Sequence, residues 1–168
     1  MTQMTIAEYE KLNPTLHCEI RGTKLIYCVP NQTTLWRAQT LENKEPDTVE
    51  WVQGFQKDSI FLDVGANVGI YTVLAAKVTG CYVYAIEPES QNYAILNRNI
   101  VVNKILERTT AYAIALSDIT GFDKLYLSDF VSGSSCHSYG EQVDFNLEPV
   151  QTGLHQGCYA TTIDELVE

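Results

Sequence analysis

A glycine-rich loop, DVGANVG at residues 63–69, stands between a predicted buried strand, SIFLDV, and a predicted helix, IYTVLAAKV. Glycine lets a backbone approach a ligand closely, and asparagine tolerates the left-handed torsions that most residues avoid. A strand-to-helix turn of this kind presents free backbone N–H groups at the carboxyl edge of a sheet, where open α/β folds bind ligands. We therefore predict a cofactor-binding loop whose contacting residues are Asp63, Gly65, Ala66, Asn67 and Gly69.

Acidic residues also follow the next two predicted strands. Glu87 ends the strand CYVYAIEP, and its carboxylate offers two acceptor oxygens in one plane, which suits both hydroxyls of a ribose. Ser117 and Asp118 end the third strand, TTAYAIALSD, where Asp118 can accept a hydrogen bond from an adenine amino group. Two alternatives stay open, because Glu87 can instead cap the next helix and Asp118 can instead form a turn.

The residue types in the loop bear on which cofactor it takes. The G-x-G-x-x-G fingerprint of nicotinamide enzymes needs glycine where this chain has Asp63 and Asn67. A carboxylate at the first position can accept a hydrogen bond from an ammonium group, which the methionine part of S-adenosylmethionine carries. The loop therefore favours S-adenosylmethionine over a dinucleotide.

The elements that must position these residues alternate in type from Ser59 onward. Strands alternating with helices predict an α/β fold with a doubly wound, mostly parallel, Rossmann-like sheet. We expect residues 1–57 to form an N-terminal hairpin and helical cap, and residues 58–168 to form the cofactor-binding half of a second domain. Residues 121–131 predict one strand of an inserted hairpin, residues 132–157 an irregular stretch, and Thr162 the cap of a final helix.

Composition and charge narrow the class of protein. The chain has 168 residues, 45% of them hydrophobic, and a net charge of −10, with one Lys or Arg against eight Asp or Glu in residues 119–168. Binders of nucleic acid neutralise phosphates with clustered Lys and Arg, so a nucleic-acid partner is not expected. No apolar run is long enough to span a membrane and no secretory signal is visible, so we expect a cytoplasmic protein without membrane insertion.

Cysteine and histidine give a weaker signal. The five cysteines are scattered without a C-x-x-C pair, which fits free thiols. Cys136-His137 and His155-x-x-Cys158 could supply zinc ligands, but the spacing is atypical and we expect no resident metal.

Five ordered segments together resemble the FkbM family of S-adenosylmethionine-dependent methyltransferases: FLDVGANVGIYTVLAAK, AIEPES, ILNRNIVVNK, AIALSDITG and ATTIDELVE. The resemblance covers about residues 45–168 and includes Glu45-Pro46, which precedes the cofactor domain in such proteins. It implies a class I methyltransferase fold, with S-adenosylmethionine bound by the residues named above. It also implies methyl transfer to a hydroxyl of a small-molecule or glycan acceptor, such as a sugar or a polyketide-like compound.

One departure from the family matters. Its members continue past the ID-E-L segment into further strands, so this chain resembles an N-terminal portion, truncated after the third parallel strand. The first strand would then be a sheet edge, from which we expect self-association and poor activity of this chain alone.

Two other functions stay open. One is a nucleoside-cofactor-binding fragment without turnover, and the other is an NAD-binding Rossmann protein. The sequence does not identify a catalytic base.

Overall fold

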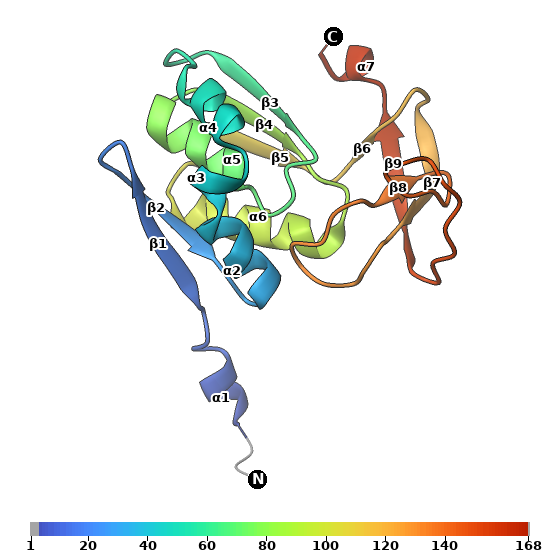
Figure 1. Cartoon of the computed structure of the whole chain (residues 1–168), viewed down its shortest axis with the longest axis horizontal. Helices are drawn as coiled ribbons and strands as arrows, with labels where there is room; N and C mark the ends of the chain where they lie inside the picture. Colours follow the sequence, from blue (N-terminus) through green and yellow to red (C-terminus); the bar gives the residue numbers. More distant parts are fainter. Residues whose placement is uncertain (1–3, 168) are drawn as a thin grey trace.

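The computed structural model describes residues 4–167, which form an N-terminal arm, a body built around a parallel sheet, and a second β-rich unit (Figure 1). The elements, in chain order, are α1 (Ile6–Tyr9), β1 (Thr15–Ile20), β2 (Thr23–Cys28), α2 (Gln32–Gln39), α3 (Leu41–Lys44), α4 (Pro46–Gln53), β3 (Ile60–Val64), α5 (Ile70–Leu74), a π-helical turn (Ala75–Thr79), β4 (Tyr82–Ile86), α6 (Ser90–Val102), β5 (Thr109–Tyr112), β6 (Ala115–Leu116), β7 (Gly121–Tyr126), β8 (Ser138–Tyr139), β9 (His155–Thr161) and α7 (Ile163–Val167).

The central sheet has the order β3-β4-β5, and all its strands are parallel. Parallel neighbours require a crossover, which α5 supplies between β3 and β4 and α6 between β4 and β5. The register places Asp63 beside Ala85 and Val64 beside Ile86, so the chain leaves β3 and β4 at the same edge. The predicted α/β class and its parallel, Rossmann-like sheet are confirmed.

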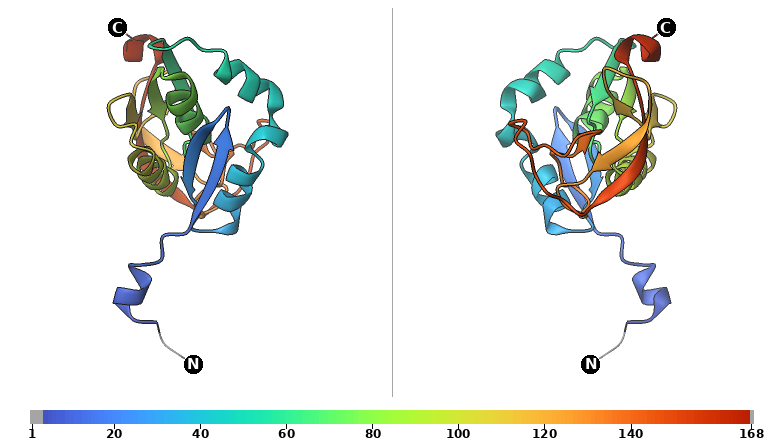
Figure 2. Two further views of the ribbon diagram at one scale, coloured as in Figure 1. Left: turned by 90° about the vertical axis from the view of Figure 1, so that its left-hand side faces the viewer. Right: turned by 90° about the vertical axis from the view of Figure 1, so that its right-hand side faces the viewer.

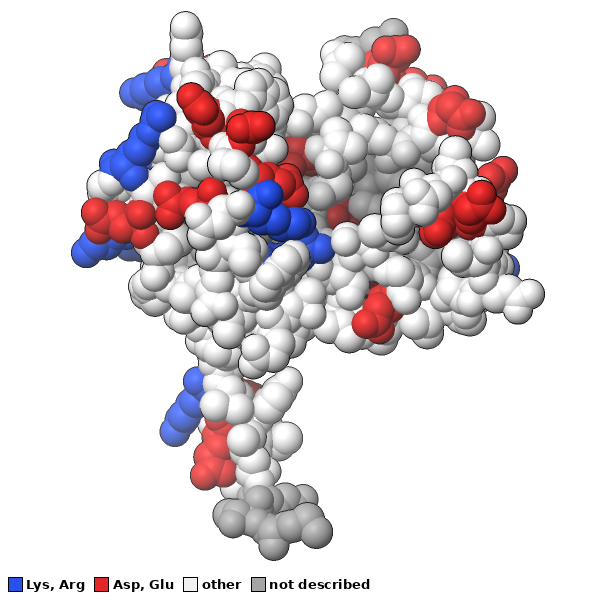
Figure 3. Space-filling model, viewed as in Figure 1, with Lys and Arg blue, Asp and Glu red and all other residues white. Residues whose placement is uncertain are grey.

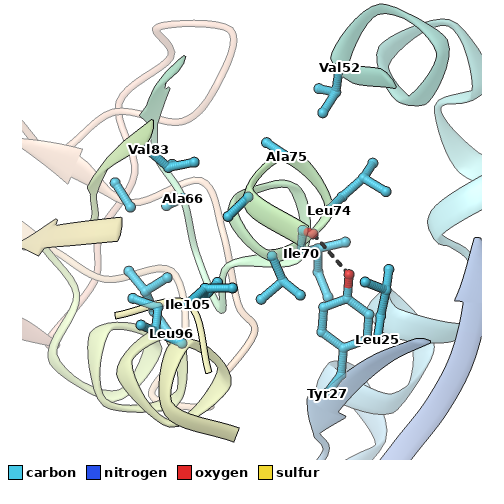
Figure 4. Close-up of a cluster of buried hydrophobic side chains, with 14 of the residues drawn as sticks. Leu25, Tyr27, Val52, Ala66, Ile70, Leu74, Ala75, Val83, Leu96 and Ile105 are labelled. Atoms are coloured by element: carbon cyan, nitrogen blue, oxygen red, sulfur yellow. Dashed lines mark hydrogen bonds between the residues drawn. The ribbon is translucent and has the colours of Figure 1, made fainter. Parts of the chain in front are cut away.

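The main core lies on the helical face of this sheet. Alternate strand residues, Phe61, Val83 and Ala85 among them, are buried there, as the period of two in a strand requires. Figure 4 shows Val83 on one side of α5 and Tyr27 of β2 on the other, where the Tyr27 hydroxyl donates to the Ile70 carbonyl at 3.0 Å. The helices therefore lie between the sheet and the N-terminal hairpin.

The N-terminal elements form as the sequence predicts. The hairpin β1–β2 pairs around Arg21-Gly22, Asn31 caps α2 by accepting from the Thr34 N–H, and Pro46 opens α4. Figure 2 shows the hairpin and helices α2–α4 wrapped around α5. The core joins side chains from before and after residue 57, so the predicted boundary between residues 57 and 58 does not separate two cores.

The second unit is a sheet of order β6-β9-β7-β8 with its own small core. The prediction of one continuous third strand is wrong, because TTAYAIALSD divides into β5 in the parallel sheet and β6, which pairs with β9. The predicted strand at residues 121–131 is present as β7, and it pairs with β8 and β9 in antiparallel fashion. Thr162 caps α7 as predicted, since its hydroxyl accepts from the Glu165 N–H at 3.2 Å.

The other face of the parallel sheet is open. Together with α7 it lines a cavity of about 400 Å³, visible as a hollow in Figure 3, whose lining residues are Ile60, Leu62, Tyr84, Tyr112, Leu166 and Val167. Within residues 4–167 no strand pairs with the free edge of β3, which matches the expected sheet edge. Self-association through this edge stays a prediction.

Candidate functional site

The glycine loop closes tightly between β3 and α5. The N–H groups of Gly65 and Ala66 both donate to the Ile86 carbonyl at 2.9 Å, which fixes the loop against the end of β4. The two glycines have different surroundings. A Cβ at Gly69 would lie 2.5 Å from Leu96 Cδ1, whereas a Cβ at Gly65 would meet no atom within 4 Å. Gly69 thus serves packing, and Gly65 borders open space.

Glu87 lies directly against the loop. Its Oε2 accepts from the backbone N–H of Asn67 at 2.7 Å, and its Oε1 accepts from the N–H of Glu89 at 2.9 Å. Burial raises the pKa of Glu87, while these two backbone donors act in the opposite direction. Each carboxylate oxygen has a second lone pair, so Glu87 can accept further hydrogen bonds from a ligand. The structure therefore brings Glu87 into contact with the glycine loop, as the predicted site requires.

Glu87 does not cap the following helix. That role belongs to Glu89, which is also buried and accepts from the N–H groups of Gln91 and Asn92 at 2.9 and 2.8 Å. The alternative in which Glu87 serves as the helix cap is therefore not what the structure shows.

Asp63 is buried at the end of β3, with 8% of its surface exposed. The Thr72 hydroxyl donates to its Oδ2 at 2.5 Å. Burial raises the pKa of Asp63, and the hydrogen bonds from Thr72 lower it. Asp63 therefore links β3 to the first turn of α5, and one of its oxygens is already engaged by the protein.

Ser117 and Asp118 lie in the second unit rather than beside the loop. The Ser117 N–H donates to the Thr161 carbonyl at 3.0 Å, and the Ser117 hydroxyl donates to Asp118 Oδ1 at 3.1 Å. Asp118 is exposed, and no hydrogen bond in the described chain joins it to Glu87 or to the loop. The structure thus brings Asp63 and Glu87 together without Asp118, and a nucleoside contact of Ser117 or Asp118 stays a prediction.

A segment that the sequence analysis treated as irregular crosses the site. We call residues Ser132–Ser134 the strap; it lies in the loop that reaches from β7 toward α2 and α6 in Figure 1. The Ser134 carbonyl accepts from the side-chain amides of Asn67 at 2.7 Å and Asn92 at 3.0 Å. Asn92 also accepts from the Gly133 N–H at 2.6 Å. The strap is thus tied to both the glycine loop and α6.

The strap is held from the N-terminal side as well. The Asn31 side chain donates to the Ser132 carbonyl at 3.0 Å, and Arg37 Nε donates to the Gly133 carbonyl at 2.5 Å. Gly133 has a φ of +92°, and a Cβ there would lie 3.1–3.2 Å from the methyl groups of Thr33 and Thr34. The left-handed torsion and the close approach to α2 both favour glycine at this position. The Ser-Gly-Ser-Ser composition was a signal for a turn, but it did not reveal what the turn contacts.

A small charged recess adjoins the site at the start of α5. It has a volume of about 40 Å³ and is lined by Arg37, Thr40, Leu41, Lys44, Glu45, Ile70 and Tyr71. Burial raises the pKa of Tyr71. Its hydroxyl donates to Glu45 Oε2 at 3.0 Å, and this hydrogen bond raises the pKa of Tyr71 further and lowers that of Glu45. Lys44 pairs with Glu45 Oε1 at 3.2 Å. The recess therefore holds charges of both signs.

Asn67 is the residue that connects these parts. Its φ of +52° is left-handed, as the sequence predicts for this position. Its N–H contacts Glu87 and its amide nitrogen contacts the strap, while its buried Oδ1 has no partner among the described residues. An unpartnered buried oxygen costs free energy unless a ligand donates to it.

The zinc alternative finds no support in the structure. Among residues 4–167, no three His, Cys, Asp or Glu side chains gather closely enough to hold a metal ion. Cys136 is exposed and Cys158 is buried in the small core of the second unit.

Comparison with known proteins gives likenesses in structure alone. No family model matches the chain, and no curated protein matches it in sequence. Similar solved structures include M. jannaschii TYW2 in complex with AdoMet, with 18% identity, 58% of this chain and 42% of that chain covered, and a TM-score of 0.40. Another is the SAM-dependent methyltransferase from Agrobacterium tumefaciens, with 12% identity, 64% and 35% covered, and a TM-score of 0.40. The chain spans less than half the length of either protein.

Proposed function

We propose that this chain binds S-adenosylmethionine at the carboxyl edge of β3 and β4, and that it acts as a methyltransferase on a hydroxyl group. The observation that carries this proposal is the contact of Glu87 with the Asn67 N–H at 2.7 Å, beside the open space at Gly65. A buried carboxylate fixed at the end of the second strand, next to a glycine turn, suits a ribose in an open α/β fold.

The residues present fit the cofactor in three respects. Gly65 leaves room for the ligand, Glu87 keeps lone pairs for the ribose hydroxyls, and no donor within residues 4–167 reaches the buried Oδ1 of Asn67. We assign these residues to the nucleoside and the adjoining part of the cofactor. When bound, the sulfonium supplies the methyl group for in-line displacement by the acceptor oxygen.

The chain's own contribution is to position the cofactor and to limit access of water. Holding donor and acceptor in a fixed geometry removes much of the entropic barrier to a two-substrate reaction. The strap is bonded to Asn67 and Asn92, so it lies directly against the glycine loop and α6. An alcohol acceptor also needs a base to take its proton, and no side chain of the site is assigned to that role.

The distribution of charge supports a small-molecule or glycan acceptor over a nucleic acid. The C-terminal residues 119–168 carry one Lys or Arg and eight Asp or Glu. Figure 3 shows acidic side chains spread over the second unit beside the hollow. A phosphate backbone would be repelled by this surface. No helix among residues 4–167 is both long and apolar enough to cross a membrane, and a cytoplasmic location remains our expectation.

Two competing functions differ from the proposal, one in turnover and the other in the ligand bound. A fragment that binds the cofactor without turnover would contain the same nucleoside site, and the low coverage of the longer methyltransferases is compatible with it. An NAD-binding protein is disfavoured by Asp63, which occupies the position of a fingerprint glycine and is bonded to Thr72.

Titration calorimetry with S-adenosylmethionine, S-adenosylhomocysteine and NAD tests the proposal. We expect the first two to bind and NAD not to bind. Gly65→Val should abolish binding by filling the open space, whereas Gly22→Val, at an exposed glycine of the hairpin turn with the same left-handed φ (+74° against +73°) and equally free surroundings, should not. Binding of NAD alone would overturn the proposal, and a turnover assay with labelled S-adenosylmethionine and a sugar panel separates an enzyme from a silent binder.

A further inference from the structure

Arg37 is a half-buried cation that forms no ion pair with a carboxylate of residues 4–167. It lies on α2 and lines the charged recess at the start of α5. Its Nε donates to the Gly133 carbonyl at 2.5 Å. Among the described residues, no Asp or Glu oxygen lies within 4.0 Å of its guanidinium.

This situation is unfavourable for a charge. Burial lowers the pKa of Arg37, and the carboxylates of Glu45 and Glu87 are near enough to oppose that shift without forming an ion pair. Removing a cation from water costs free energy that a well-placed anion recovers. The guanidinium has five N–H donors, of which the strap uses one, so it can hold a carboxylate in a two-bonded arrangement.

The recess also has room for a small anion. Its volume of about 40 Å³ exceeds what one water molecule needs, so a carboxylate fits beside Arg37. Ile70 and Tyr71, which line it, directly follow the glycine loop. Glu45 adds a negative charge to the same recess, which suits a ligand that carries both a carboxylate and an ammonium group.

We propose that Arg37 binds the α-carboxylate at the amino-acid end of the cofactor, so that the N-terminal helices complete the cofactor site. This inference rests on the proposed function and adds a binding residue from outside the parallel sheet. Arg37 also donates to the strap, so the same side chain joins the strap and the cofactor.

Two ligands of the same nucleoside test the assignment. S-adenosylhomocysteine carries the amino-acid end, and 5′-methylthioadenosine lacks it. We expect Arg37→Gln to weaken the binding of S-adenosylhomocysteine by about 10- to 100-fold, the range for a hydrogen bond to a charged group. The affinity for 5′-methylthioadenosine should change by less than about twofold. Retained binding of 5′-methylthioadenosine also shows that the variant is folded.

Two control variants separate the carboxylate contact from other effects. Arg21→Gln makes the same chemical change at an exposed arginine, whose Nη1 donates to the Gln53 carbonyl at 3.2 Å, and it should leave both ligands unaffected. Asn31→Ser keeps a side chain that caps α2 but removes the donor to the Ser132 carbonyl. If Arg37 acts only by holding the strap, Asn31→Ser and Arg37→Gln should each weaken the binding of both ligands to the same extent.

A measurement on the unmodified chain guards against a variant that fails to fold. S-adenosylhomocysteine without its carboxylate should bind about 10-fold or more weakly than the intact compound. The assignment of Arg37 would be overturned if S-adenosylhomocysteine with and without its carboxylate bound equally well, or if Arg37→Gln weakened the binding of S-adenosylhomocysteine and 5′-methylthioadenosine equally. Either result would leave the nucleoside site standing. Failure of the parent chain to bind either nucleoside would instead overturn the proposed function, and this inference with it.

Discussion

Asp63 and Glu87 follow β3 and β4, which are neighbours in one parallel sheet, whereas Asp118 follows β6, which belongs to a second sheet. The first two residues are buried at a common edge, and the N–H of Asn67 donates to Glu87 at 2.7 Å. Asp118 is exposed, and its neighbour Ser117 bonds to β9. Acidic residues at the ends of successive strands converge only when those strands share a sheet.

The largest expected effect concerns the glycines of the two regions. Gly69 has a φ of +82° and its Cβ would collide with fully buried Leu96, while Gly157 of β9 has free surroundings and no left-handed torsion. Gly69→Ala should lower the free energy of unfolding by about 3 kcal/mol, combining backbone strain and overpacking. Gly157→Ala should change it by less than about 1 kcal/mol. Urea denaturation measures both, and equal effects would show that Gly69 is not required by packing.

The next effect tests the tie between the strap and α6. Asn92 is fully buried and makes two hydrogen bonds to the strap, so Asn92→Ala should cost about 2–4 kcal/mol by leaving buried groups unpaired. Hydrogen exchange at the Gly133 amide should accelerate with it. Thr152→Ala, which removes the hydroxyl that donates to the Leu127 carbonyl in the second unit, should cost about 1 kcal/mol and leave that amide protected. Unchanged exchange at Gly133 in Asn92→Ala would contradict the tie.

Conservative substitutions of Glu87 and Asp118 test the contrast between the two sheets directly. Glu87→Gln should reduce the free energy of binding of S-adenosylhomocysteine by about 1–3 kcal/mol, the range for hydrogen bonds to a charged group. Asp118→Asn should have an effect within about 0.5 kcal/mol, since this residue is exposed and no hydrogen bond in the described chain joins it to Glu87 or to the glycine loop. Calorimetry on both variants is the measurement. A larger loss in Asp118→Asn would mean that the second unit moves onto the nucleoside when it binds.

The dependence of binding on pH gives the smallest effect. In the proposed site the ionised form of Glu87 accepts hydrogen bonds from the ribose, so we expect affinity to be retained above the pKa of Glu87 and lost as the pH falls through it. Burial raises this pKa above the ordinary value of 4.5, so the loss should begin at a higher pH than for an exposed glutamate. Calorimetry from about pH 5 to 8 should show the decline in the parent chain and in Asp118→Asn, but a flatter profile in Glu87→Gln.

The sequence was sufficient where local chemistry decides the structure. Alternation of strands and helices predicted the parallel sheet, and Asn67 and Gly69 adopt the left-handed torsions expected of their types. Pro46 and Thr162 begin helices as their types predict. In each case the deciding interactions lie within a few residues of one another.

Contacts between distant segments could not be predicted in this way. The break between β5 and β6 depends on pairing with β9, about forty residues later, and no local signal marks it. The strap and Arg37 reach the site from opposite ends of the chain. One signal was available in retrospect. Buried Asn92 and Asn99 on α6, and Asn103 directly after it, are too polar for a purely apolar helix face, and each bonds to another segment.

The most direct test of the cofactor site is a crystal structure of the chain with S-adenosylhomocysteine bound. The account predicts that the ribose hydroxyls lie within hydrogen-bond distance, about 2.5–3.2 Å, of the Glu87 carboxylate, and that the ligand passes beside Gly65. A nucleoside found instead in the hollow between the open sheet face and α7, or beside Asp118 with Glu87 free of it, would contradict the account.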